Sequence, residues 1–211
     1  MILTGQLDSP FVRRVAIALH VYGVDYENST ISAFDDFGRL LAINPLGKVP
    51  ALELDDGAVL VDSTLILDYL DRVAGDEKTL LANDLESRAK LLPHIGIAVG
   101  LAEKAVEYRG ETVRRSPEKH DMARVERVMA QIAAALAWLE AHTPEEGFLG
   151  GGELTHADIA SACAVAFIAN KNAEHLAAQV KETETGFSKL LAHTARCESL
   201  DAFRAAPFPP A

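Results

Sequence analysis

Cysteine is scarce in this chain: Cys163 and Cys197 are the only two, and none lies near the N-terminus. Two thiols this far apart exclude a disulfide framework and a cysteine-rich metal cluster, so we expect both to be buried as small hydrophobic side chains. The seven histidines are scattered without the short spacings of metal ligands. The sequence therefore predicts no metal site.

Positive charge is also in short supply, because 20 Lys and Arg residues stand against 31 Asp and Glu residues, a formal net charge of −11. Nucleic-acid binding needs a basic face, so we expect no nucleic-acid partner. No apolar run is long enough to span a bilayer, and residues 1–5 lack the basic start and apolar stretch of a signal peptide. We therefore expect no membrane contact and a cytoplasmic location.

What the N-terminal part does contain is a pattern of alternating strands and helices. Short runs at residues 2–4 and 26–31 predict strands, and between them Ser9-Pro10 predicts a helix start, because proline is favoured at the first helical position. An Asp-Asp-Gly turn signal between two apolar runs predicts a hairpin over residues 51–61. Apolar side chains spaced by three and four then predict a helix over residues 63–74.

The remainder of the chain carries no convincing strand pattern. Apolar residues recur every three or four positions from Met122 to Leu139, which predicts a long amphipathic helix that Ser116-Pro117 would open. Thr155, followed by Asp158, predicts a capping box at the start of another helix. We therefore expect three parts, an N-terminal domain over residues 1–75, a polar linker over 76–84 and an all-helical domain over 85–211.

The segment Asn44–Pro50, with Asp62-Ser63 twelve residues further on, predicts a binding site for a small peptide-like anion. Val49 precedes a proline and is therefore extended, which leaves its N–H and C=O available to the backbone of a peptide ligand. The free N–H groups of a helix that begins near Asp62 would bind an anion, and the acid beside them would bind an ammonium. An ordinary turn followed by an ordinary helix cap would produce the same residues.

Three segments of the sequence together resemble the glutathione S-transferase family, and the looser resemblance covers nearly the whole chain. Ser9-Pro10-Phe11-Val12 resembles the Cys-Pro-aromatic-Cys turn of glutaredoxins with both cysteines replaced, and is similar to the start of bacterial serine-type members. Asn44–Pro50 resembles the loop before the family's cis-proline, and Asp62-Ser63 its acid–serine pair. Residues 152–158 resemble a family signature in the helical domain, which we assign to folding.

The resemblance implies a fold that combines an α/β domain with an all-α domain. The N-terminal domain would be thioredoxin-like, with a four-stranded mixed sheet and helices, and the C-terminal domain would be a helical bundle. The family is also homodimeric, and its dimers use the helix that starts at Ser63 together with the first long helix of the helical domain. Pro93 lies inside that long helix, where it either serves this interface or simply kinks the helix.

The resemblance further implies glutathione, γ-glutamyl-cysteinyl-glycine, as co-substrate, with no metal. Asp62 would bind the γ-glutamyl ammonium, and Ser63 with the helix N-terminus would bind the adjacent carboxylate. Val49, held extended by Pro50, would pair with the cysteinyl backbone. Lys48 either binds the glycyl carboxylate or is a solvated loop lysine.

Ser9 is the residue that the resemblance assigns to catalysis. A free thiol has a pKa near 8.5, and the thiolate is the nucleophile. The Ser9 hydroxyl at a helix N-terminus would stabilise the glutathione thiolate, although the same residue could also be a plain helix cap. The first tyrosine, Tyr22, comes too late for a tyrosine-type site, and the absence of a cysteine in the turn excludes disulfide exchange there.

The expected activity is transfer of glutathione to a small hydrophobic electrophile, an alkyl or aryl transfer that belongs to detoxification. Asp8 beside Ser9 opposes a thiolate, and Asp62 is one methylene shorter than the commoner glutamate, so weak activity is expected. Isomerisation, dehalogenation and peroxide reduction stay open, as does a non-catalytic binding protein of the stringent-starvation type. The residues expected to contact the electrophile are Phe11, Tyr108 and Arg109, the last two with a solvated helix end as the alternative.

Overall fold

The computed structural model describes residues 1–76, 78–172 and 186–209, and their contacts divide the chain into two units. The first unit comprises Met1–Leu85 together with the segment from Ser199 onward. The second, which we call the helical unit, comprises Glu86–Glu198. The sequence pattern places residues 199–211 in the helical domain, whereas the described part of this segment belongs to the same unit as the sheet.

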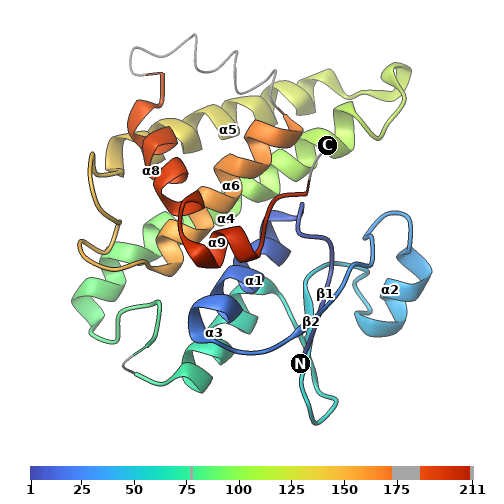
Figure 1. Cartoon of the computed structure of the whole chain (residues 1–211). Coiled ribbons are helices and arrows are strands. Elements are labelled where there is room, and N and C mark those ends of the chain that lie inside the picture. Colours follow the sequence, from blue (N-terminus) through green and yellow to red (C-terminus); the bar gives the residue numbers. More distant parts are fainter. Residues whose placement is uncertain (77, 173–185, 210–211) are drawn as a thin grey trace. The chain divides into compact units, whose positions relative to one another are not determined.

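The first unit is built on a four-stranded sheet with the order β2-β1-β3-β4. Its strands β1 and β2 are labelled in Figure 1. The strands are β1 (Ile2–Thr4), β2 (Glu27–Ser29), β3 (Ala51–Glu53) and β4 (Val59–Val61). β1 runs parallel to β2 and antiparallel to β3, and β3 runs antiparallel to β4. The sheet is therefore mixed, which confirms the expected thioredoxin-like arrangement.

Three helices surround this sheet: α1 (Pro10–Tyr22), α2 (Phe37–Ile43) and α3 (Ser63–Ala74). α1 and α3 pack against each other, and Figure 1 shows them on one side of the sheet with α2 on the other. The local signals at the ends of α1 are confirmed. Ser9 is its N-cap with Pro10 at the first position, and Gly23 ends it with a φ of 67°, a left-handed conformation that glycine adopts without steric cost.

The stretch expected as a linker, 76–84, lies within the first unit, and some of its described residues are packed there. Leu80 and Leu81 are buried, and the backbone N–H of Leu80 donates to the Tyr22 hydroxyl and to Asp71 Oδ1. The Tyr22 hydroxyl also contacts Asp71 Oδ1. Burial and the neighbouring Asp71 carboxylate raise the pKa of Tyr22 far above its ordinary value, so the phenol stays protonated and donates to Asp71.

The helical unit contains α4 (Leu85–Thr112), α5 (Met122–His142), α6 (His156–Lys171) and α8 (Ser188–Glu198), with no strand in its described part. α4 continues across Pro93. The apolar positions expected to form one face of α5 are buried from Val125 to Leu139, whereas Met122, at the start of the helix, is exposed. These helices confirm the expected all-helical domain for the described residues, while residues 173–185 of that domain lie outside them.

One expected helix start is wrong. Ser116-Pro117 opens only the short 3-10 helix η1 (Pro117–Lys119), and Asp121 caps α5 by accepting a hydrogen bond from the backbone N–H of Arg124. Both residue pairs are good start signals, but an Asp one residue before the apolar face can satisfy the free N–H groups of the long helix directly.

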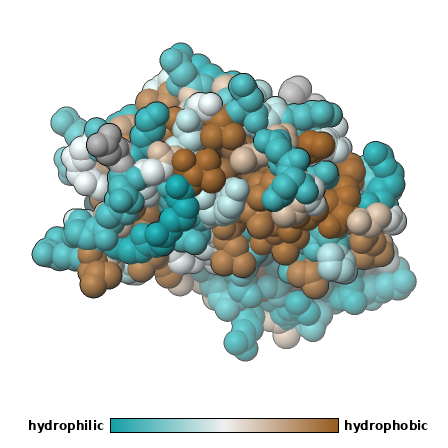
Figure 2. Space-filling model, turned by 90° about the horizontal axis from the view of Figure 1, so that it is seen from below, coloured by the Kyte–Doolittle hydropathy of each residue, from teal (hydrophilic) through white to brown (hydrophobic). Residues whose placement is uncertain are grey.

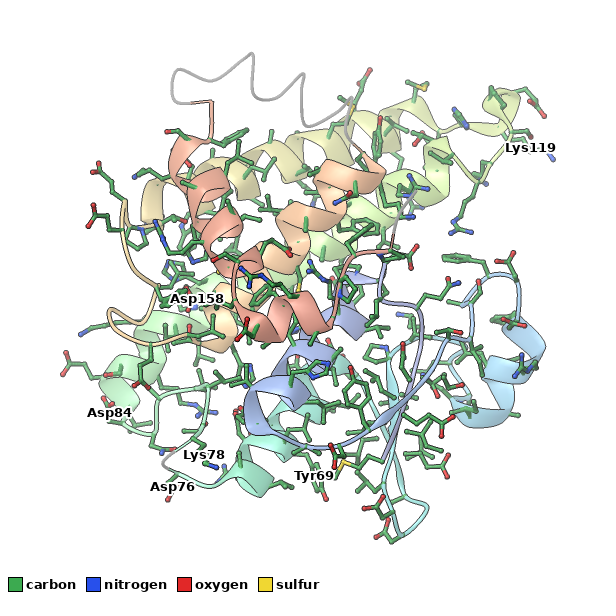
Figure 3. The ribbon with its side chains drawn as sticks, viewed as in Figure 1. Tyr69, Asp76, Lys78, Asp84, Lys119 and Asp158 are labelled. Atoms are coloured by element: carbon green, nitrogen blue, oxygen red, sulfur yellow. The ribbon has the colours of Figure 1, made fainter. Side chains whose placement is uncertain are left out.

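The predicted capping box of α6 is confirmed, and it extends further than the sequence indicated. The Thr155 hydroxyl accepts from the backbone N–H of Asp158, while the Asp158 carboxylate accepts from the backbone N–H of Thr155. Asp158, labelled in Figure 3, also accepts from Leu149 N and from His193 Nε2 of α8 at 2.7 Å each. One carboxylate therefore joins the preceding loop, α6 and α8.

The returning C-terminal segment contains α9 (Asp201–Ala205), which packs on α1. Arg13 of α1 is almost fully buried; its Nε donates to the carbonyl oxygen of Ala206 at 2.9 Å, and its guanidinium lies 5.7 Å from the centre of the Phe203 ring. Because Phe203 is itself fully buried, this segment completes the core of the first unit. None of the described helices is both long and apolar enough to cross a bilayer.

Candidate functional site at one edge of the sheet

The predicted peptide-binding segments meet at one edge of the sheet because of the strand register. Thr4 of β1 pairs with Ala51 of β3, and Ala51 pairs with Val61 of β4. β1 and β4 end at this edge and β3 begins there. The turn that leads into α1, the Val49-Pro50 step and the start of α3 therefore emerge side by side.

Gly5, just after β1, is what allows α1 and the Val49 loop to approach so closely. A Cβ atom at this position would lie 2.4 Å from Val12 Cγ2 and 2.9 Å from Val49 Cβ, and the φ of Gly5 is 135°. Any larger residue would clash with both, so only glycine fits here. The sequence offered a glycine after a strand, but not the partners that require it.

The loop before Pro50 is held by Asn44, which is buried. Its Nδ2 donates to the carbonyl oxygen of Lys48 at 2.7 Å, and its Oδ1 accepts from Leu46 N at 3.0 Å. The Val49-Pro50 bond is cis, as the resemblance implied. The N–H and C=O of Val49 have no hydrogen-bond partner among the described residues, so they remain available to a ligand's backbone. Lys48 is exposed.

Asp62 is the N-cap of α3 and adopts a φ of 70°. Its Oδ1 accepts from Thr64 N at 2.8 Å and from Leu65 N at 3.3 Å, while no described residue contacts Oδ2 through a hydrogen bond. The cap therefore uses one oxygen of an exposed carboxylate and leaves the other available. The backbone N–H of Ser63 also lacks an acceptor among the described residues, as expected for the first residue of a helix.

The Ser63 side chain is 5% exposed and contacts a residue that the sequence did not single out. Arg14 of α1 donates from Nη1 to Ser63 Oγ at 3.3 Å and to Thr64 Oγ1 at 3.4 Å. Two adjacent arginines inside an otherwise apolar helix were the only available signal, since such residues are rarely buried without a specific partner.

Ser9 is half-buried, and its Oγ accepts from Val12 N at 3.4 Å. A serine hydroxyl accepts and donates at the same time, so this cap leaves its hydrogen available. The helix-cap alternative for Ser9 is thus present, and it does not compete with hydrogen bonding to a thiolate. Asp8 is half-buried beside it.

The residues expected to contact an electrophile belong to different units. Phe11 is half-buried on α1, whereas Tyr108 and Arg109 lie near the end of α4. The Arg109 guanidinium donates to the carbonyl oxygen of Lys171 at the end of α6, and the carbonyl of Tyr108 accepts from the Thr112 hydroxyl. Among the described residues no group of three or more His, Cys, Asp or Glu side chains could hold a metal ion.

Both halves of the chain are similar to known protein families. Residues 3–78 match the family model described as "Glutathione S-transferase, N-terminal domain", and residues 122–196 match the model described as "Glutathione S-transferase, C-terminal domain". Maleylacetoacetate isomerase of Pseudomonas aeruginosa is 38% identical over 82 residues, which span 36% of this chain and 38% of the isomerase.

Two further relatives match over most of their length. An uncharacterised glutathione S-transferase-like protein of Escherichia coli is 28% identical over 80% of this chain and 82% of its own. The crystal structure of a glutathione transferase family member from Pseudomonas fluorescens with bound glutathione has a TM-score of 0.83 and 30% identity, and the match covers 99% of each chain.

Proposed function

Because the chain belongs to the glutathione S-transferase family, we propose that it binds glutathione at the sheet edge of its first unit and activates the thiol for attack on a small hydrophobic electrophile. The observation that carries this proposal is the convergence at one edge of the Val49 backbone, unpaired among the described residues, the Asp62-Ser63 helix start and the Ser9 hydroxyl. The glutathione bound to the 30% identical family member supports the choice of ligand.

Each charged or polar part of glutathione can be assigned a binding group in this arrangement. The Oδ2 atom of Asp62 binds the γ-glutamyl ammonium, and the N–H and hydroxyl of Ser63 bind the neighbouring carboxylate, helped by the positive end of α3. The N–H and C=O of Val49, oriented by Pro50, pair with the cysteinyl unit. Lys48 is exposed on the same loop and binds the glycyl carboxylate.

Ser9 stabilises the thiolate by donating its hydroxyl hydrogen to the sulfur. Lowering a thiol pKa from about 8.5 by two units requires roughly 2.7 kcal/mol of preference for the anion. A hydrogen bond to a charged group contributes about 1.5–3 kcal/mol. The Ser9 hydroxyl together with the positive N-terminus of α1 can therefore supply the stabilisation of the thiolate that this pKa change requires. The thiolate then attacks the electrophile and displaces its leaving group, and Ser9 forms no covalent bond.

The remaining expectations belong to this proposal as well. The glutathione-binding domain is residues 1–75, and the helical domain from residue 85 contributes Tyr108 and Arg109 to contacts with the electrophile, as Phe11 does from the first domain. The enzyme acts in the cytoplasm as a homodimer. The electrophile is left open, and the match to an isomerase makes isomerisation a reaction to include in any assay panel.

The decisive experiment separates the two roles of Ser9. Ser9→Gly removes the hydroxyl but caps a helix nearly as well as serine, whereas Ser9→Ala removes both functions. We expect both variants to be retained on glutathione-agarose and to lose at least tenfold in kcat/KM with chlorodinitrobenzene near pH 7. Only Ser9→Ala should lose about 1 kcal/mol of stability in thermal unfolding.

Other results would point elsewhere. Retention on the resin with no turnover by the wild type toward a panel of electrophiles would favour the non-catalytic binding protein. Loss of activity in Ser9→Ala alone would make Ser9 a structural cap. Failure of the wild type to bind glutathione at all would reject the ligand and the site together.

A further inference from the structure

Arg14 is a buried cation placed directly behind the anion-binding end of α3. Its side chain is only 3% exposed, and its Nη1 lies within hydrogen-bonding distance of two hydroxyl oxygens, Ser63 Oγ and Thr64 Oγ1. The neighbouring Arg13 contacts the C-terminal segment, where it donates to Ala206. Of these contacts, the ones that Arg14 makes lie at the proposed site.

The chemistry of this contact decides which way the Ser63 hydroxyl points. A guanidinium group only donates hydrogen bonds, so Ser63 Oγ must act as the acceptor toward Arg14. Its own hydrogen is then directed away from Arg14. We propose that Arg14 is a positioning residue that holds the Ser63 hydroxyl as an obligate donor to the α-carboxylate of the γ-glutamyl end of glutathione. This inference rests on the proposed function, because Ser63 is there the carboxylate-binding residue.

The position of Arg14 also favours an anion over a neutral group at the start of α3. A hydroxyl that accepts from a cation is polarised and becomes a stronger donor, and the effect is larger where water is excluded. Both Arg14 and Ser63 are more than nine-tenths buried, so their contact is poorly screened by solvent. The N–H of Ser63, which has no acceptor among the described residues, adds a second donor from the helix end.

A purely structural arginine would behave differently. If Arg14 only bound α1 to α3, its loss would weaken the binding of every ligand to the same extent, through distortion or lower stability. If Arg14 acts through the Ser63 hydroxyl, its loss must weaken only ligands that carry the carboxylate. The comparison therefore needs two peptides that differ in that group alone.

Calorimetric titration with glutathione and with 4-aminobutyryl-cysteinyl-glycine, which lacks the α-carboxylate, supplies this comparison. For Arg14→Met we expect Kd for glutathione to rise about tenfold and Kd for the analogue to change less than twofold. Arg14→Lys keeps a cationic donor and should restore most of the affinity for glutathione. The amide of Arg14→Gln can donate or accept a hydrogen bond, so its Kd for glutathione should lie between those of Arg14→Met and Arg14→Lys. This variant also provides a polar substitute if Arg14→Met does not fold.

Two further variants complete the design. Ser63→Ala combined with Arg14→Met should be no worse for glutathione than Ser63→Ala alone, because the arginine acts through that hydroxyl. Arg13→Met is the matched control on the same helix: it should lower thermal stability while leaving the ratio of the two Kd values as in the wild type.

The outcomes separate this inference from the proposed function. Wild-type protein that binds glutathione, together with an unchanged Kd ratio in Arg14→Met and Arg14→Gln, would overturn the role of Arg14 and leave the proposed function intact. Additive losses in the double variant would overturn it as well. Wild-type protein that binds neither peptide would reject the proposed function, and the role of Arg14 with it.

Discussion

Two side chains at the proposed site cap helices while keeping atoms available for a ligand. Asp62 uses one carboxylate oxygen to cap α3, and Ser9 uses its oxygen to cap α1 while its hydrogen remains available. A helix cap and a ligand contact are therefore compatible in one residue, because they use different atoms or opposite ends of a hydroxyl. The two interpretations of these residues that the sequence left open are both compatible with the geometry.

Because the helix cap and the proposed ligand contact of Asp62 use different properties of its side chain, a substitution can separate them. Asn caps a helix as well as Asp, so Asp62→Asn should leave the unfolding temperature within a degree or so while removing the charge that we propose binds an ammonium. We expect Kd for glutathione to rise several-fold, since exposed charge pairs contribute about 0.2–1 kcal/mol and a hydrogen bond to a charged group somewhat more.

Titration calorimetry and thermal unfolding of the Asp62→Asn variant measure the two effects separately. Asp62→Ala, which loses cap and charge, should reduce both affinity and stability. Equal glutathione affinity in wild type and Asp62→Asn would exclude a charge interaction between Asp62 and the ligand.

The environment of Asp158 predicts that the free energy of unfolding decreases at acidic pH. Burial alone would raise the pKa of this carboxyl, but hydrogen bonds from His193, the backbone of Leu149 and the Thr155 hydroxyl lower it below its usual value. A depressed pKa means that the folded state prefers the carboxylate, so this contribution is fully present above the unfolded pKa, near 3.9, and is lost as pH falls through the lower folded pKa.

Urea unfolding at several pH values between about 2.5 and 6 tests this. Wild-type stability should fall more steeply below about pH 4 than that of Asp158→Asn, which has no charge to lose. Thr155→Ala keeps the carboxylate, so it should cost about 1 kcal/mol while retaining the acid dependence. Parallel curves for wild type and Asp158→Asn would contradict the prediction.

At the scale of the element, local signals predicted the first unit well. The Ser-Pro start of α1, its glycine end, the Asp-Gly hairpin and the Asp-Ser start of α3 are each encoded within a few residues, and each lies where the sequence predicts it. Ser116-Pro117 failed because a second start signal, Asp121, follows closely, and only packing decides which one the long helix uses.

Contacts between distant segments were beyond what the sequence could predict. Periodicity reports which face of a helix is apolar, but not which partner covers it. The return of α9 to α1, the Asp158–His193 contact and the position of Arg14 behind Ser63 all join residues that are 35 or more positions apart. The proposed ligand-binding motif could be hypothesised from the sequence because its pieces follow a known order, whereas the residues that contact it from other elements could not.

The contact between α9 and α1 makes a prediction about the first unit. Phe203 is fully buried beneath Arg13, so Phe203→Ala should leave a cavity and cost about 3–5 kcal/mol. Thermal unfolding followed by circular dichroism measures the loss. Leu46→Ala, at a largely exposed side chain, is the control and should change stability by less than about 0.5 kcal/mol. A similar small effect for Phe203→Ala would mean that α9 does not contribute to the core.

At the scale of the whole molecule, hydrophobic side chains remain at the surface among hydrophilic ones, as Figure 2 shows. α3 is the clearest case, because Ile66, Leu67 and Leu70 are buried while Leu65 is 66% and Val73 is 49% exposed. A surface helix normally carries polar residues opposite its buried face, and exposed apolar side chains on a monomer often mark a protein interface. This pattern supports the proposed homodimer.

Light scattering after size exclusion tests the assembly directly. The wild type should have about twice the chain mass of 22.7 kDa. The double variant Leu65→Glu/Val73→Glu should approach the mass of a single chain, because dimerisation would bury two added carboxylates of each copy in the interface, which is costly. Met122→Glu, at a 58% exposed position that begins α5, is the matched control and should keep the dimer mass. A dimer that survives both α3 substitutions would exclude this face of α3 as the interface, since an interface that contained it could not accommodate the added charge.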